Sequence, residues 1–98
     1  MEKPVRLNKD EIRAIKETVL HFDPEAEIIL FGSRTDLSKK GGDIDLLIVS
    51  SKIKHRERRK IRVELFKKLG DRKIDIVTTE NPSKSAFTAL AYKYGVKL

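Results

Sequence analysis

The sequence predicts one small α/β (α+β) domain spanning residues 1–98, with its elements in the order helix, strand, strand, helix, strand, helix. Apolar residues recur at helical spacing in three segments, and three short apolar runs between them are typical of strands. The loop between the first two strands is too short for a helical crossover, so we expect those strands to be antiparallel. A helix before the third strand suits a right-handed parallel connection. We therefore expect a three-stranded mixed sheet packed with helices.

The first helix is predicted to begin at Asn8, whose side chain can cap the helix while Glu11 reaches back to it. Its inward face is formed by residues at helical spacing, namely Ile12, Ile15, Val19 and Phe22. The turn beginning at Asp23 ends it. Residues 27–31 form a short apolar run that ends at Gly32, which favours a strand.

The second strand is predicted over residues 43–49, because its end is a continuous apolar run of the kind found in strands covered on both faces. Ser50 and Ser51 follow it and are candidate caps for the next helix. That helix is expected to continue to Leu69, where Gly70 is a natural terminator.

The third strand is predicted over residues 74–77, with Asp75 inside it. A final helix is expected to begin at the segment 81–83, which reads Asn-Pro-Ser, and to close at Gly95. Five of its residues form a stripe that we expect to face inward, namely Ala86, Phe87, Leu90, Ala91 and Tyr94.

The formal net charge of +7 is unevenly distributed along the chain. Residues 52–73 contain eleven Lys or Arg against three acidic residues, so the remainder is nearly neutral. Such a basic stripe attracts polyanions such as nucleic acid or nucleotides. A solvated helix face explains it at least as well, because a chain that is 38% charged is also typical of a heat-adapted surface.

The composition excludes several classes of protein. The chain has no cysteine, which excludes disulfides, thiolate zinc sites and cysteine nucleophiles. No apolar run approaches the roughly 20 residues that span a bilayer, and the first ten residues are polar rather than a signal-peptide core. We expect a cytoplasmic protein with no membrane contact.

Three acidic residues are candidate metal ligands. Asp43 and Asp45 alternate on the second strand and so project from the same face. If the third strand lies parallel beside it, Asp75 falls next to them, because a helical crossover returns the chain to the same end of the sheet. Carboxylates at such separations repel unless a cation lies between them. Oxygen ligands without histidine or cysteine suit Mg²⁺.

A candidate phosphate-binding turn follows the first strand. Gly32 allows the backbone to approach a ligand, and consecutive N–H groups with the Ser33 hydroxyl can donate to phosphate oxygens. Arg34 adds a charged donor. Taken singly, a Gly-Ser pair is more often a simple turn, and an exposed strand acid more often has no special role. The order and spacing of the pieces shift the balance towards one shared site.

The segments 31–34 and 42–48 together resemble the signature of the DNA polymerase beta-type nucleotidyltransferase superfamily, and most closely its minimal nucleotidyltransferase (MNT) branch. The resemblance covers almost the whole chain. It implies the nucleotidyltransferase fold and transfer of a nucleotide from a nucleoside triphosphate such as ATP with two Mg²⁺ ions. Asp43, Asp45 and Asp75 would be the catalytic carboxylates that hold metal, and Gly32, Ser33 and Arg34 would bind the nucleotide.

The same resemblance implies a setting, because MNT proteins commonly pair with small helical HEPN proteins, in some cases as antitoxins that attach AMP to a tyrosine of the HEPN ribonuclease. A different class of function stays open, namely a partner-binding protein that keeps the fold without catalysis. Nucleic-acid binding through residues 52–73 is a third interpretation and is less favoured, because Phe66 is the only aromatic residue available there for stacking.

Overall fold

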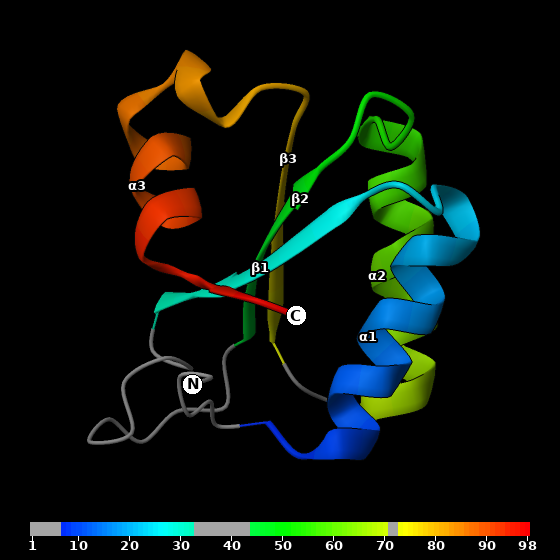
Figure 1. Ribbon diagram of the computed structural model, residues 1–98. Helices are drawn as coiled ribbons and strands as arrows, with labels where there is room; N and C mark the ends of the chain where they lie inside the picture. Colours follow the sequence, from blue (N-terminus) through cyan, green and yellow to red (C-terminus); the bar gives the residue numbers. More distant parts are fainter. Residues whose placement is uncertain (1–6, 33–43, 71–72) are drawn as a thin grey trace.

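A computed structural model describes residues 7–32, 44–70 and 73–98. In this part of the chain, a sheet with the order β3-β2-β1-β4 separates two layers of helices. Helices α1 (Lys9–Phe22) and α2 (His55–Leu69) pack on one face, while α3 (Ala86–Tyr94) lies on the other (Figure 1). The predicted mixed α/β architecture is confirmed.

The start of α1 follows the prediction closely. The Asn8 side chain accepts from the Glu11 N–H at 2.8 Å, and the Asn8 N–H donates to Glu11 Oε1 at 3.0 Å. This reciprocal pair satisfies two of the backbone donors that a helix start leaves unpaired. The helix ends where Asp23 adopts an extended conformation.

The strand pairing is also as predicted. Strand β1 (Glu27–Phe31) pairs antiparallel with β2 (Ile44–Val49), and β2 pairs parallel with β3 (Ile74–Thr79). The predicted start of the second strand, Asp43, lies outside the described residues. The third strand runs two residues beyond the predicted end at Val77, because Thr78 and Thr79 continue the ladder.

The predicted number of three strands is wrong, because the sheet has four. Strand β4 (Val96–Lys97) pairs antiparallel with β1, and the Leu98 N–H extends the ladder by donating to Ile28 O at 2.9 Å. A strand of two residues is too short to produce an alternating pattern. It lies at the edge of the sheet beside β1, and this position depends on where the chain leaves α3.

The prediction that Ser50 and Ser51 cap the second helix is wrong. Helix α2 begins at His55, and its N-cap Lys54 donates its N–H to Glu57 Oε1 at 2.9 Å. Ser50 instead organises the turn before the helix. The predicted terminator is confirmed, since Gly70 ends α2 with φ +83°.

The final helix is divided in two. Asn81 caps a short 3₁₀ turn, η2 (Pro82–Lys84), and α3 then begins after Ser85, whose hydroxyl accepts from the Thr88 N–H at 3.1 Å. Ser85 is extended, so it interrupts the helix that we expected to run on from Asn81.

The predicted inward stripe on this helix is largely wrong. Ala91 is buried, but Phe87, Leu90 and Tyr94 are 54%, 57% and 60% exposed, and Ala86 is also exposed. The stripe is apolar at helical spacing, yet the buried residues of α3 are only Thr88 and Ala91. Three large apolar side chains are therefore left on the surface.

Two apolar clusters of unequal size hold the layers together. The larger lies between the sheet and helices α1 and α2, and its fully buried members include Ile15, Val19, Leu30, Ile44, Leu46, Ile48, Ile61 and Leu65. The smaller joins Ile29 and Leu47 of the sheet to Ala91 of α3. Alternate residues of β2 therefore face opposite layers, as the pleat of a strand requires. No helix within the described ranges is long and apolar enough to cross a membrane.

Candidate active site

Two of the three predicted acids lie directly beside each other. In the parallel pairing of β2 with β3, Asp45 and Asp75 are Cα partners. Asp45 alternates with Ile44 and Leu46, which face α1 and α2, so its side chain projects on the opposite face with Leu47. Asp75 alternates with Ile74 and Ile76 in the same way. We call this end of the sheet, where β2 and β3 begin, the acidic end.

The glycine of the predicted phosphate turn lies against one of these acids, Asp45. Phe31, the last residue of β1, is the Cα partner of Asp45, so Gly32 follows immediately beside it. A Cβ placed on Gly32 would lie 2.3 Å from Asp45 Oδ2, and Gly32 has φ +75°. Only glycine combines this left-handed backbone with room for the neighbouring carboxylate.

Three predicted site residues, namely Ser33, Arg34 and Asp43, lie outside the described residues. The structure therefore brings together Gly32, Asp45 and Asp75 from three different strands or strand ends. The roles predicted for all six residues stay predictions.

The donor set at the acidic end suits a hard divalent cation. Asp45 and Asp75 are both partly exposed, and their oxygen donors are of the type that Mg²⁺ prefers. Within the described ranges, no group of three acidic, histidine or cysteine side chains forms a metal-binding cluster. His21 lies in the last turn of α1, and His55 is the first residue of α2. Both helices cover the face of the sheet opposite the Asp45 side chain.

An apolar groove adjoins the acidic end and was not predicted. We call it the α3 groove; its volume is about 310 Å³, and its lining includes Phe31, Gly32, Phe87, Leu90, Tyr94 and Gly95. The rings of Phe31 and Phe87 meet edge to face with centroids 5.6 Å apart. The sequence contained one indication of this groove, the apolar stripe on α3. Helical spacing alone, however, does not distinguish a helix face that packs in the core from one that lines a groove.

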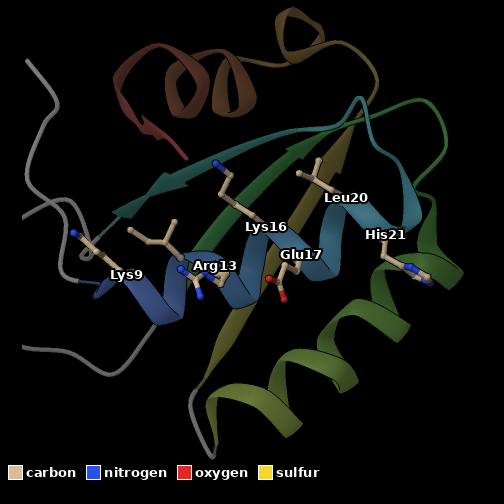
Figure 2. A pocket seen from close by; sticks show the side chains of 7 residues that line it. Lys9, Arg13, Lys16, Glu17, Leu20 and His21 are labelled. Carbon is tan, nitrogen blue, oxygen red and sulfur yellow. The ribbon is translucent and has the colours of Figure 1, made fainter.

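A larger hollow lies elsewhere and has a different character. It measures about 670 Å³, and all of its described lining residues belong to α1, including Lys9, Arg13 and Lys16 (Figure 2). Because α1 packs on the opposite face of the sheet, this hollow does not lie on the face that carries the side chains of Asp45 and Asp75.

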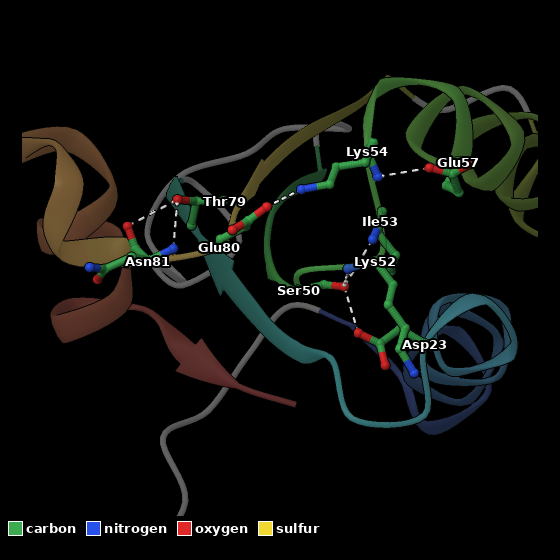
Figure 3. Close-up of polar contacts among 9 residues, drawn as sticks. All are labelled: Asp23, Ser50, Lys52, Ile53, Lys54, Glu57, Thr79, Glu80 and Asn81. Atoms are coloured by element: carbon green, nitrogen blue, oxygen red, sulfur yellow. Dashed lines mark hydrogen bonds and ion pairs between the residues drawn. The ribbon is translucent and has the colours of Figure 1, made fainter.

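The other end of the sheet is braced by hydrogen bonds (Figure 3). Ser50 Oγ donates to Asp23 Oδ2 at 2.5 Å and accepts from the N–H groups of Lys52 and Ile53 at 3.0 Å. The bond from Ser50 lowers the pKa of the Asp23 carboxyl, with a further contribution from the Glu25 N–H. These contacts join the end of α1 to the end of β2.

An ion pair acts at the same end. Lys54, at the start of α2, pairs with Glu80 after β3, and this hydrogen bond lowers the pKa of Glu80 (Figure 3). The strand ends away from Asp45 and Asp75 are therefore tied to both helices of one layer. These contacts lie at the end of the sheet opposite the acidic end.

Comparison with known protein families agrees with this fold. No curated protein matches the chain. The family model described as nucleotidyltransferase domain matches residues 12–95. That span includes the acidic end, the glycine bend and α3. The chain therefore belongs to the nucleotidyltransferase domain family, whose members transfer a nucleoside monophosphate from a nucleoside triphosphate.

Proposed function

We propose that this chain is a magnesium-dependent nucleotidyltransferase of the MNT branch that transfers AMP from ATP to a hydroxyl of a HEPN-type helical partner protein. The observation that carries the proposal is the direct pairing of Asp45 with Asp75 beside Gly32. Two carboxylates held side by side repel each other, so the arrangement is favourable when a divalent cation shares them.

In this proposal Asp43, Asp45 and Asp75 hold two Mg²⁺ ions. Support comes from the oxygen donors of Asp45 and Asp75, their common face and their partial exposure. The chemistry that magnesium supplies when bound at such a site is activation of the attacking hydroxyl and neutralisation of the departing pyrophosphate. The carboxylates fix where that positive charge lies.

Gly32, Ser33 and Arg34 would receive the triphosphate. Support comes from the left-handed backbone of Gly32 at the end of β1, next to Asp45. In such a bend, successive N–H groups point into a concavity that suits phosphate oxygens. The guanidinium of Arg34 would add charge-assisted hydrogen bonds.

The reaction exchanges one phosphorus–oxygen bond for another. The acceptor hydroxyl oxygen forms a bond to the α-phosphorus of ATP, while the bond from that phosphorus to the oxygen bridging the β-phosphate breaks. Pyrophosphate leaves, and the hydroxyl proton passes to the Asp75 carboxylate and then to solvent. The protein acts mainly by positioning and electrostatics.

The acceptor is proposed from the resemblance of the segments 31–34 and 42–48 to the MNT branch. Attachment of AMP to a tyrosine of a HEPN ribonuclease would make the chain an antitoxin. The alternative is a non-catalytic protein that neutralises the same partner by contact alone.

One experiment separates the two. The chain is incubated with ATP, Mg²⁺ and the product of a neighbouring HEPN-type gene, and the intact mass of that product is measured. Added AMP units that require Mg²⁺ support the transferase. A tight complex with no change in mass overturns it in favour of contact inhibition. ATP without Mg²⁺ is the control for non-enzymatic modification.

A further inference from the structure

We propose that the α3 groove binds the nucleoside moiety of the triphosphate, with the base stacked among the aromatic rings of Phe31, Phe87 and Tyr94. This inference rests on the function proposed above and adds the part of the site that grips the base and sugar. It assigns a role to a surface that the proposed phosphate and metal chemistry does not use.

The groove is continuous with the acidic end. Gly32 lines the groove and also abuts the Asp45 carboxylate. Phe31 is the Cα partner of Asp45 and contributes its ring to the groove wall. A ligand whose phosphates lie at Asp45 and Gly32 therefore needs only to extend past the bend for its other end to reach α3.

The lining of the groove matches a flat, uncharged ring system. Its described residues are aromatic, aliphatic or glycine, and none is charged. Its volume of about 310 Å³ lies at the lower end of the usual range for small-molecule sites. Bases stack on aromatic side chains whatever their hydrogen-bonding edges, because every base presents a flat π-face.

The exposure of α3 supports the same conclusion. Phe87, Leu90 and Tyr94 are each more than half exposed although they lie in one short helix. Large apolar side chains that form a contiguous exposed patch mark ligand-binding grooves or interaction sites, whereas single exposed apolar residues are normal. Covering them with a base would remove this apolar surface from water without changing the fold.

The test compares two ligands that share phosphates and differ in the nucleoside. Affinities of the whole chain for ATP and for inorganic tripolyphosphate are measured by titration calorimetry in the presence of Mg²⁺. We expect ATP to bind more tightly. We also expect Phe87→Ala to weaken ATP binding about 5- to 150-fold, the range that one lost base–aromatic stack gives, and to leave tripolyphosphate unchanged.

The chain offers a matched control. Phe66, on α2 in the other layer, is 54% exposed, the same fraction as Phe87. Phe66→Ala should change neither affinity. A second variant, Phe87→Trp, keeps a stacking ring and should retain ATP binding close to that of the unaltered chain. Thermal unfolding of each variant shows whether the fold is kept.

The outcomes separate this inference from the proposed function. Equal affinity of the unaltered chain for ATP and tripolyphosphate, or an equal loss of both in Phe87→Ala, overturns the groove assignment while leaving the phosphate site. A Phe87→Ala chain that binds ATP normally but no longer binds its acceptor protein assigns the groove to the acceptor instead. An unaltered chain that binds neither ligand overturns both proposals.

Discussion

Gly32 and Asp45 are in contact across the end of two strands, and the glycine is required because the aspartate occupies the space that any side chain would need. The contact joins the predicted phosphate turn to the predicted metal ligand. Placement of the carboxylate thus depends on a residue that itself carries no functional group.

Gly32→Ala should lower nucleotide transfer by about 100-fold or more, because displacement of a reacting group by about 1 Å can have that effect. Gly70→Ala is the matched control, since Gly70 also has positive φ but a Cβ added to it would have nothing within 4 Å. It should lose about 1–3 kcal/mol of stability from backbone strain and keep full activity. Equal activity of the two variants would contradict the role given to this contact.

Asp75→Asn should abolish most transfer, with a loss of at least about 100-fold, while leaving the metal-free fold as stable as before or more so. The substitution removes a negative charge beside Asp45 and relieves repulsion. Mg²⁺ with ATP should raise the unfolding temperature of the unaltered chain, because a ligand that binds only the folded state stabilises it. The unfolding temperature of the Asp75→Asn chain should rise much less when Mg²⁺ and ATP are added.

Asp10→Asn is the control for this prediction. Asp10 is an exposed acid in the first turn of α1, which packs on the opposite face of the sheet from the Asp45 side chain. It should transfer nucleotide normally and keep the stabilisation by Mg²⁺ and ATP. If Asp75→Asn behaves like Asp10→Asn in both measurements, Asp75 is not part of the site.

Much of the fold could be predicted because its signals are local. The reciprocal cap at Asn8 and the apolar run of β1 each lie within a few residues, and the structure has both where expected. The parallel direction of the strands that carry Asp45 and Asp75 could be predicted because a helical crossover connects them, and their proximity followed once the strands were taken to be neighbours.

The remaining features depend on distant contacts. Strand β4 pairs with β1 directly after Gly95, which packs closely against Ile29 and Leu30 of that strand. Ser50 bonds Asp23, 27 residues earlier, instead of capping α2. The stripe on α3 has the spacing of a core face, but nothing in the spacing tells how much of the helix the sheet covers. The apolar groove therefore emerged only from the structure.

Ser50→Ala should destabilise the fold by about 1.5–3 kcal/mol at neutral pH, because Oδ2 of the buried Asp23 carboxylate loses the hydrogen bond from the Ser50 hydroxyl. The folded pKa of Asp23 lies below its ordinary value of 3.8, so this contribution is present above pH 3.8 and is lost as the pH falls through the folded pKa. The difference from the unaltered chain should therefore narrow in acid.

Urea unfolding at neutral pH and near pH 3 measures this difference. Ser51→Ala, at the exposed neighbour, should change stability by less than about 0.5 kcal/mol. A gap between the Ser50→Ala and unaltered chains that stays constant with pH would show that the Asp23 contact does not contribute. Transfer activity of Ser50→Ala should be normal below its unfolding temperature, since the contact lies at the far end of the sheet.

Tyr92→Phe should raise the pKa of Glu27 towards its ordinary value of 4.5. Tyr92 Oη donates to Glu27 Oε2 at 2.8 Å, and this bond is the largest cause of the lowered pKa, ahead of the contact with Lys97. Nuclear magnetic resonance titration of the Glu27 carboxyl measures the change. Lys97→Met should also raise this pKa, because Lys97 contributes both a hydrogen bond and its positive charge, and an unchanged pKa in the Tyr92→Phe chain would contradict this account.

Gly95→Ala should destabilise the chain by about 1–3 kcal/mol, the usual cost of overpacking. A Cβ there would lie 2.5 Å from Ile29 Cγ2, 2.6 Å from Ala91 O and 2.9 Å from Leu30 O. Two of these atoms belong to the backbone, so no side-chain rotation relieves the clash.

Gly95 differs from Gly70 because its φ of −74° is open to any residue, so its substitution tests packing without backbone strain. Gly95→Ala and Gly70→Ala should therefore destabilise the chain in different ways. Gly95→Ala must push α3 away from β1 and widen the α3 groove, so ATP affinity should fall along with the unfolding temperature. Gly70→Ala should lower the unfolding temperature alone. A Gly95→Ala chain with lowered stability and unchanged ATP affinity would show that the seating of α3 on β1 does not govern nucleotide binding.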